Sequence, residues 1–280
     1  MTDRLCYIQK MLNLVNKLPL DGCDLRYADS GGAGTPVVFT HGAGVDHAMF
    51  DAQAGHLRAR GFRVIVWDQR GHGLSRPAGT PFTAERALAD LSALIAHLAL
   101  DRPVLAGHSL GGNLGQALVR RNPHLARALI VIGSTWNTGP LSWSERLLLK
   151  LAAPALLALP AGRLPELMAD ASALTPAARA DARRAFSQLP KRDFVQVWKA
   201  TVELVAPDPG HRTPVPLCLI RGDHDRTGNI AAAMPRWARA EGVEEVVIPD
   251  AGHLCTQDNP QAVNTAIDTF LHTLTAREER

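Results

Sequence analysis

Short runs of Val, Ile and Leu recur along the chain, and several of them are continuous rather than alternating with polar residues. Continuous apolar runs are typical of parallel strands that are buried on both faces of a sheet. Two further segments, 17–20 and 23–28, flank an Asp-Gly pair at 21–22, which favours an antiparallel hairpin at the edge of the sheet. The remaining apolar runs predict strands at residues 37–40, 63–67, 104–106, 128–133, 216–221 and 245–248.

Between these runs lie stretches whose composition favours helices. The alternation of strands and helices predicts an α/β fold with a doubly wound, mostly parallel sheet. The predicted helices cover residues 47–60, 83–98, 113–122, 230–241 and 260–275.

A Gly-x-Ser-x-Gly pentapeptide at residues 107–111 is the strongest chemical signal in the chain. It follows the apolar run at 104–106 and precedes a predicted helix, so Ser109 would sit on a sharp turn from strand to helix. Glycines two residues before and after the serine leave room for the chain to fold back. A serine there lies near a helix N-terminus, which stabilises an oxyanion. The pattern predicts that Ser109 is a nucleophile.

A serine nucleophile needs a histidine base and a carboxylate that orients it, and both follow in the chain. Residues 222–225 read Gly-Asp-His-Asp and come directly after a predicted strand. Residues 249–253 read Pro-Asp-Ala-Gly-His and follow the next one. The carboxyl ends of strands are where open α/β sheets place their sites, so both segments are expected near Ser109.

Taken together, five motifs make this chain resemble an α/β-hydrolase from about Leu20 to the C-terminal helix. The resemblance implies that Ser109 is the nucleophile, Asp225 the acid and His253 the base. It also implies an oxyanion hole built from the backbone N–H groups of Ala43 and Leu110. The motifs are residues 37–44 (Val-Val-Phe-Thr-His-Gly-Ala-Gly), 67–75 (Trp-Asp-Gln-Arg-Gly-His-Gly-Leu-Ser), the serine pentapeptide, 222–225 and 252–253.

Alternative assignments exist for several of these residues. Asp223 competes with Asp225 for the acid, although the family pattern favours Asp225 and gives the first aspartate a role in loop shape. His41 and His108 are interpreted as hydrogen-bonding organisers of the motifs. His224 between two aspartates lacks the ligand spacing of a zinc site, so no metal is predicted.

Serine at the turn favours acyl transfer over the epoxide and halide chemistry that an aspartate nucleophile supports in this family. We therefore expect hydrolysis of a small to medium apolar ester, thioester or lactone through an acyl-enzyme, without a cofactor. The same triad could pass the acyl group to peroxide or to an alcohol, as a perhydrolase or an acyltransferase. A ligand-binding receptor with a vestigial triad is a third reading.

Residues 136–212 contain no convincing strand and are punctuated by eight prolines. We interpret them as the helical cap (lid) of this family, inserted into a core formed by residues 1–135 and 213–280. A cap over the serine would exclude water and shape an apolar substrate pocket. Candidate pocket residues are Trp136, Trp143, Leu147, Met168 and Trp198.

Composition adds limits on partners and location. The formal net charge of +3 over 280 residues is too small to predict nucleic-acid binding. Four cysteines without paired spacing, and no targeting or membrane-spanning pattern, predict a soluble cytoplasmic protein that is not inserted in a membrane. The first dozen residues have helical apolar spacing and could pack on the body or on a second copy, which leaves a homodimer open. The expected partner is a small-molecule substrate.

Overall fold

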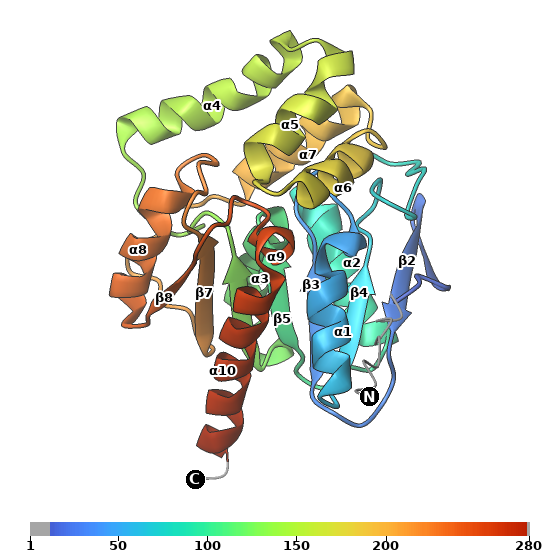
Figure 1. Cartoon of the computed structure of the whole chain (residues 1–280), viewed down its shortest axis with the longest axis vertical. Helices are drawn as coiled ribbons and strands as arrows, with labels where there is room; N and C mark the ends of the chain where they lie inside the picture. Colours follow the sequence, from blue (N-terminus) through green and yellow to red (C-terminus); the bar gives the residue numbers. More distant parts are fainter. Residues whose placement is uncertain (1–11, 279–280) are drawn as a thin grey trace, which may run out of the picture.

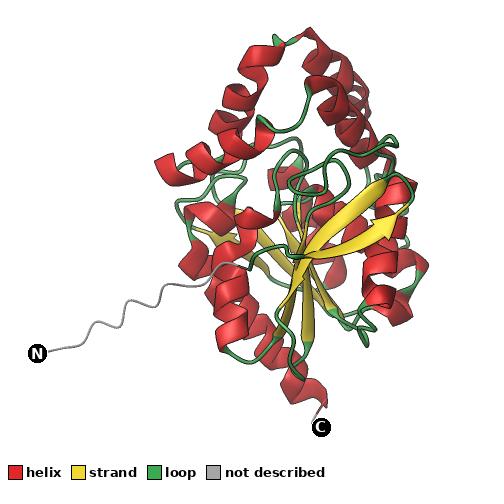
Figure 2. Ribbon diagram, turned by 90° about the vertical axis from the view of Figure 1, so that its right-hand side faces the viewer, coloured by secondary structure: helices red, strands yellow, loops and turns green. Residues whose placement is uncertain are grey.

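The computed structural model describes residues 12–278, and an eight-stranded sheet forms its centre (Figures 1 and 2). The spatial order is β1-β2-β4-β3-β5-β6-β7-β8. Strand β2 pairs antiparallel with both β1 and β4, whereas every pair from β4 to β8 is parallel. The strands are β1 (Asn16–Leu20), β2 (Cys23–Asp29), β3 (Pro36–Thr40), β4 (Arg63–Trp67), β5 (Val104–His108), β6 (Ala128–Ile132), β7 (Leu217–Gly222) and β8 (Glu245–Ile248).

Helices cover both faces of this sheet. Helices α1 and α10 lie side by side over one face, and α2 and α3 pack together over the other (Figure 1). The helices around the sheet are α1 (Asp51–Ala59), α2 (Ala84–His97), α3 (Leu110–Arg121), α8 (Ile230–Glu241), α9 (Cys255–Asp258) and α10 (Pro260–Glu278), with short 3-10 turns η1 (His47–Phe50) and η2 (Pro123–Leu125).

The central strands are buried along their whole length, as the continuous apolar runs predicted. All five residues of β5 and all five of β6 are buried. Because both faces of these strands are covered by helices, alternation with polar residues is absent. The predicted fold class, a doubly wound and mostly parallel α/β sheet, is confirmed. The amphipathic helix predicted for the first dozen residues falls almost wholly outside the described residues.

Two element boundaries differ from the prediction in an informative way. Helix α3 begins at Leu110, three residues before the predicted start at 113, because its first turn is rich in glycine and carries little apolar signal. The predicted helix at 47–60 begins as the 3-10 turn η1 and becomes α-helical only at Asp51.

Residues 136–212 hold four α-helices and no strand. These helices, which we call the cap, lie together above the carboxyl ends of the parallel strands (Figures 1 and 2). Within residues 12–278 no single helix is long and apolar enough to cross a membrane, although Trp143–Ala158 and Ala161–Ser172 pass that test jointly with a bend of 105° between them. The cap consists of α4 (Trp143–Ala158), η3 (Ala161–Arg163), α5 (Leu164–Ser172), α6 (Pro176–Phe186) and α7 (Lys191–Glu203).

Candidate active site

Ser109 occupies the single residue between the end of β5 and the start of α3. Its backbone has φ of 50° and ψ of −115°, a conformation that residues other than glycine rarely adopt. The turn is closed by neighbouring backbone: a side chain at Gly107 would collide with the backbone of Gly111, and one at Gly111 with the carbonyl oxygen of Thr40. The strained serine is therefore held by close contacts that only glycine permits.

Replacing Gly111 with Ala is expected to lower the free energy of unfolding by about 3 kcal/mol or more, because the new methyl group must push the β3 backbone aside. Urea denaturation followed by circular dichroism measures the change. Gly162→Ala is the matched control, since no atom lies within 4 Å of the added carbon there. Equal stability of the two variants would contradict this account of the turn.

His253 and Asp225 form a buried pair at the ends of two loops that follow β8 and β7. The Nδ1 atom of His253 lies 2.9 Å from Oδ2 of Asp225. The other carboxylate oxygen accepts the backbone N–H of Thr227 at 2.8 Å. Burial alone would raise the pKa of Asp225, but His253 and these hydrogen bonds outweigh it and hold the pKa below its usual value. Asp225 is thus an ionised acceptor that fixes the Nδ1–H tautomer of His253.

Asp223 has a different position. Its carboxylate accepts the backbone N–H groups of Asp250 at 3.1 Å and Ala251 at 3.0 Å, in the loop before His253. These bonds shape the loop and leave Asp225 as the carboxylate that contacts His253. The Nε2 atom of His224 lies 3.8 Å from Oδ2 of Asp223.

The side chain of His108, the last residue of β5, holds the loop that carries His253 by a hydrogen bond to the backbone of that loop. Its Nε2–H donates to the carbonyl oxygen of His253 at 2.9 Å, and the two rings lie 4.5 Å apart between centroids. Burial, helped by the nearby His253, lowers the pKa of His108 to about 3, so the ring is neutral. His108 therefore acts as a fixed hydrogen-bond donor to the loop, which agrees with its interpretation from the sequence as a hydrogen-bonding organiser.

Two buried histidines hold the loop around Ala43. The backbone N–H of Gln69 donates to Nε2 of His41 at 2.9 Å, so the proton of His41 is on Nδ1, which donates to the Gly42 carbonyl at 2.7 Å. On the other side, the Gly44 N–H donates to Nε2 of His72 at 3.1 Å. Burial lowers the pKa of both rings, and that of His72 to about 3. The loop is therefore fixed on either side of Ala43.

Leu110 is the first residue of α3, so its N–H belongs to the group that has no partner within the helix. Ala43 borders two cavities that meet at Ser109. The amides of Ala43 and Leu110 thus belong to a rigid loop and a helix start beside the serine. Such fixed donors suit a developing negative charge.

The cavities differ in character. A cavity of about 260 Å³ is lined by both aliphatic and polar side chains, and one of about 500 Å³ contains His253 and opens between cap and core. They share Ser109, Ala43, Trp198 and Thr227. The smaller is lined by Leu148, Leu149, Val202, Val205 and Ile230 among others, and the larger by Met168, Leu174, Phe186, Phe194, His224 and Arg226 among others.

The predicted pocket residues separate into two groups. Met168 and Trp198 line the cavities at Ser109. Trp136 is buried elsewhere and stacks on Trp237, with ring centroids 6.1 Å apart and planes 4° from parallel. Trp143 and Leu147 are exposed on α4 and are not among the residues that line either cavity.

The residues of α4 that do line the smaller cavity are Glu145, Leu148 and Leu149. Sequence reasoning missed Glu145 and Leu149, which lie four residues apart and therefore on one face of the helix. Glu145 also completes a capping box with Ser142. A capping box of Ser and Glu three residues apart indicates where a helix starts, but not which face of the helix turns inward.

Glu145 attaches the start of α4 to α8. Its Oε1 accepts the side-chain amide of Asn229 at 2.9 Å and the guanidinium of Arg236 at 3.0 Å. Burial would raise the pKa of Glu145, but the bonds from Asn229, Ser142 and Arg236 together lower it to about 2. The carboxylate is therefore an ionised anchor between cap and core.

Replacing Glu145 with Gln is expected to lower the free energy of unfolding at pH 7 by about 2 kcal/mol, the scale of charge-assisted hydrogen bonds. Because the folded pKa is depressed, the contribution is present above the ordinary value of 4.5 and is lost as the pH falls toward about 2. The difference between wild type and variant should therefore narrow below pH 4.5 in urea titrations. Glu203→Gln, at an exposed residue of α7, is the control. A difference that does not change with pH would refute the ionised anchor.

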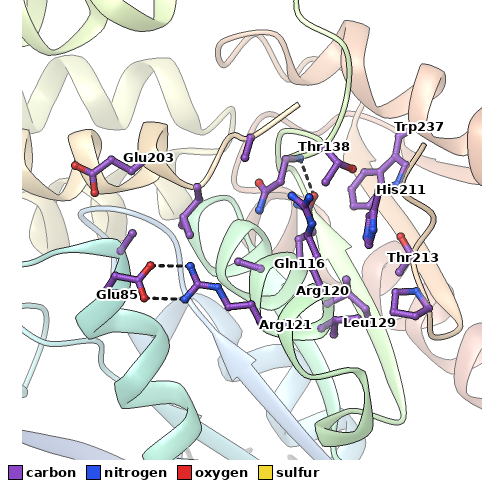
Figure 3. A pocket seen from close by; sticks show the side chains of 17 residues that line it. Glu85, Gln116, Arg120, Arg121, Leu129, Thr138, Glu203, His211, Thr213 and Trp237 are labelled. Atoms are coloured by element: carbon purple, nitrogen blue, oxygen red, sulfur yellow. Dashed lines mark hydrogen bonds and ion pairs between the residues drawn. The ribbon is translucent and has the colours of Figure 1, made fainter. Parts of the chain in front are cut away.

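A third cavity, of about 420 Å³, lies between α3, α7 and α8 and is separate from the serine (Figure 3). Its arginines are already paired: Arg121 with Glu85 at 2.6 Å and Arg120 with Asp208 at 2.7 Å. It shares no lining residue with the two cavities at Ser109.

Comparison with known proteins places the chain in a family. Residues 37–266 match the family described as "Alpha/beta hydrolase family". The chain therefore belongs to the α/β-hydrolases, and it is a hydrolase with esterase-like and other hydrolase relatives.

Individual relatives agree with this assignment. The chain is 27% identical over 260 residues to 2-(acetamidomethylene)succinate hydrolase of Mesorhizobium japonicum, covering 86% of this chain and 89% of that one. It is 37% identical over 113 residues to a non-heme haloperoxidase of Rhodococcus erythropolis, a match that spans only 40% of this chain and 41% of the relative. A thermophilic esterase from Thermogutta terrifontis has a similar structure, with a TM-score of 0.78, 27% identity and coverage of 92% and 99% of the two chains.

Proposed function

We propose that this protein hydrolyses carboxylic esters, thioesters or lactones with a small to medium apolar acyl group, through an acyl-enzyme on Ser109. The observation that carries the proposal is that His253, which contacts the buried Asp225 at 2.9 Å, lines the same cavity as Ser109. A nucleophile, a base and an orienting carboxylate are the minimum set for this chemistry.

In the proposed reaction, Oγ of Ser109 attacks the substrate carbonyl carbon while Nε2 of His253 takes the hydroxyl proton. The negative charge that develops on the carbonyl oxygen is held by the N–H groups of Ala43 and Leu110. The tetrahedral intermediate collapses to the acyl-enzyme, and His253 returns the proton to the leaving alkoxide, thiolate or ring oxygen. Water, deprotonated by His253, then releases the acid and restores Ser109. Asp225 stabilises the imidazolium at both stages.

We assign the two halves of the substrate to the two cavities. The smaller one includes the side chains of Leu148, Leu149, Val202, Val205 and Ile230 in its lining, which suit an apolar acyl chain. The larger one lies on the His253 side, where the leaving group must accept its proton, and it includes the polar residues His224 and Arg226. The alcohol, thiol or ring-oxygen half of the substrate is assigned to this cavity.

Filling the smaller cavity tests this assignment. Leu149→Trp is expected to lower kcat/KM for long-chain esters by roughly tenfold or more while sparing the acetyl ester, since each excluded methylene costs about 1–3 kcal/mol. The measurement is a p-nitrophenyl ester series from acetyl to dodecanoyl. Leu147→Trp, on the exposed side of the same helix, is the matched control. If kcat/KM falls equally for all acyl chain lengths, or if the two variants have equal effects on kcat/KM, the acyl group binds elsewhere.

A perhydrolase is the second candidate, favoured by the 37% identity to a haloperoxidase over 113 residues. In that reaction peroxide replaces water as the acyl acceptor and the product is a peracid. Peracid formation from an ester in the presence of hydrogen peroxide distinguishes it from hydrolysis alone. Binding of an ester with no turnover under either condition would instead support a receptor with a vestigial triad.

A further inference from the structure

The outer face of α4 is apolar and exposed. Trp143 is 79% exposed, Leu148 67%, and Leu147, Leu151 and Leu157 are each about half exposed. Within residues 12–278, this one helix carries five of the eleven large hydrophobic side chains that are exposed. Isolated exposed leucines are ordinary, but a cluster of this kind marks an interaction surface.

Within residues 12–278, the contacts that hold α4 come from its inner side. Glu145 binds Asn229 and Arg236, and the helix packs against α7. At its far end, Nζ of Lys191 donates to the carbonyl oxygens of Leu157 and Leu159. Figure 1 shows α4 at the top of the molecule, with the remaining cap helices below it. Its outer face is directed away from the body.

The charges on this helix indicate what the outer face meets. Arg146 and Lys150 are exposed, lie one turn apart beside the apolar residues, and form no ion pair within the described part of the chain. The single acid of α4, Glu145, is turned inward to Arg236. A Trp and Leu surface bordered by cations, with no exposed acid, is typical of helices that lie in the headgroup region of anionic lipids.

We propose that α4 docks onto an anionic lipid or amphiphile surface, with Trp143, Leu147 and Leu151 entering the interface and Arg146 and Lys150 contacting headgroups. These three apolar residues are spaced by four and therefore form one stripe along the helix. Docking of a single helix in this way requires no segment to cross a bilayer. The proposal stands on the surface of α4 and does not depend on the catalytic role of Ser109.

A second copy of the chain fits the same face poorly. A two-fold contact pairs the same surface on both partners, so the cations of α4 would meet cations or apolar residues and no acid. The area is also small. A helix of 16 residues is about 24 Å long, so a stripe about 10 Å wide offers roughly 240 Å². Stable dimers bury about 800 Å² on each partner.

One residue of α4 belongs both to the exposed apolar face of the helix and to the smaller cavity. Leu148 is among its exposed residues and also lines the small cavity beside Ser109, together with Leu149. When the protein docks through α4, the edge of the cavity formed by Leu148 would lie against the lipid surface. Apolar substrates dissolved in the surface could then reach the cavity without crossing water.

Co-sedimentation with vesicles of phosphatidylglycerol, compared with vesicles of phosphatidylcholine, tests the proposal on the full chain. The wild type should bind the anionic vesicles, and the triple variant Trp143→Ser, Leu147→Ser, Leu151→Ser should bind at least about tenfold more weakly. Arg146→Gln with Lys150→Gln should lower binding to the anionic vesicles by roughly fivefold for each charge removed. The control Val15→Ser, Leu125→Ser, Val247→Ser removes three exposed apolar side chains away from the cap and should bind as the wild type does.

Other outcomes would overturn the proposal. Absence of binding to the anionic vesicles would do so, as would equal loss in the α4 triple variant and in the control variant. Analytical ultracentrifugation tests the alternative that this face pairs two copies of the chain. If the wild type is a dimer and the α4 triple variant a monomer, with no vesicle binding by either, the face is an interface between two copies. Ser109→Ala should bind vesicles as the wild type does, which separates this test from that of the proposed reaction.

Discussion

The Ser109→Ala variant is expected to fold as the wild type does and to lose ester hydrolysis by a factor on the order of 10⁴ or more in kcat. The expectation follows from the position of Ser109 between β5 and α3, beside the cavity that contains His253. Removing the hydroxyl removes the bond-forming atom and leaves the amides of Ala43 and Leu110 in place, so a small residual rate is expected.

The measurement is kcat and KM on an acetyl ester, with circular dichroism and thermal unfolding to show that the variant is folded. Ser92→Ala is the matched control, because Ser92 lies on α2 and, among the described residues, its hydroxyl donates only to its own helix, at the carbonyl oxygen of Leu88. Its activity should equal that of the wild type. If Ser109→Ala retains more than about a tenth of the wild-type kcat while it is folded, another residue is the nucleophile.

The second large effect is expected at Asp225. Asp225→Asn should lower kcat by roughly 10⁴, because an amide lacks the charge that stabilises the imidazolium and no longer fixes the Nδ1–H tautomer of His253. KM should change little, since Asp225 is buried behind the histidine and is not a lining residue of either cavity at Ser109.

Asp223→Asn provides the comparison within the same loop. Its carboxylate accepts two backbone N–H groups, so the variant should lose stability but keep kcat within about tenfold of the wild type. A larger loss of kcat in Asp223→Asn than in Asp225→Asn would reverse the two roles. The pair of variants therefore decides between the two aspartates of the Gly-Asp-x-Asp motif.

The strands and the turn at Ser109 could be predicted from the sequence because each depends on the residues within it. Continuous apolar runs marked the parallel strands, and the glycines of residues 107–111 marked a turn whose backbone closes on Thr40. The candidate residues Ser109, Asp225 and His253 each follow a strand, so the fold alone brings their loops to one edge of the sheet.

The pocket could not be predicted in the same way, because it depends on how each cap helix is rotated about its own axis. Trp136, Trp143 and Leu147 looked like pocket residues, yet one packs on Trp237 and two are exposed on α4. The inward face of α4 is set by the distant partners of Glu145, namely Asn229 and Arg236. The bond from His108 to the His253 carbonyl likewise joins residues 145 positions apart.

The central claim is that Ser109 forms the covalent intermediate, and a fluorophosphonate probe read by intact-mass spectrometry tests it most directly. The account predicts one adduct per chain, mapped to the peptide that contains Ser109. It also predicts that Ser109→Ala gains no adduct and that Asp225→Asn is labelled much more slowly. An unlabelled wild type that still hydrolyses esters, or an adduct on any other residue, would contradict it.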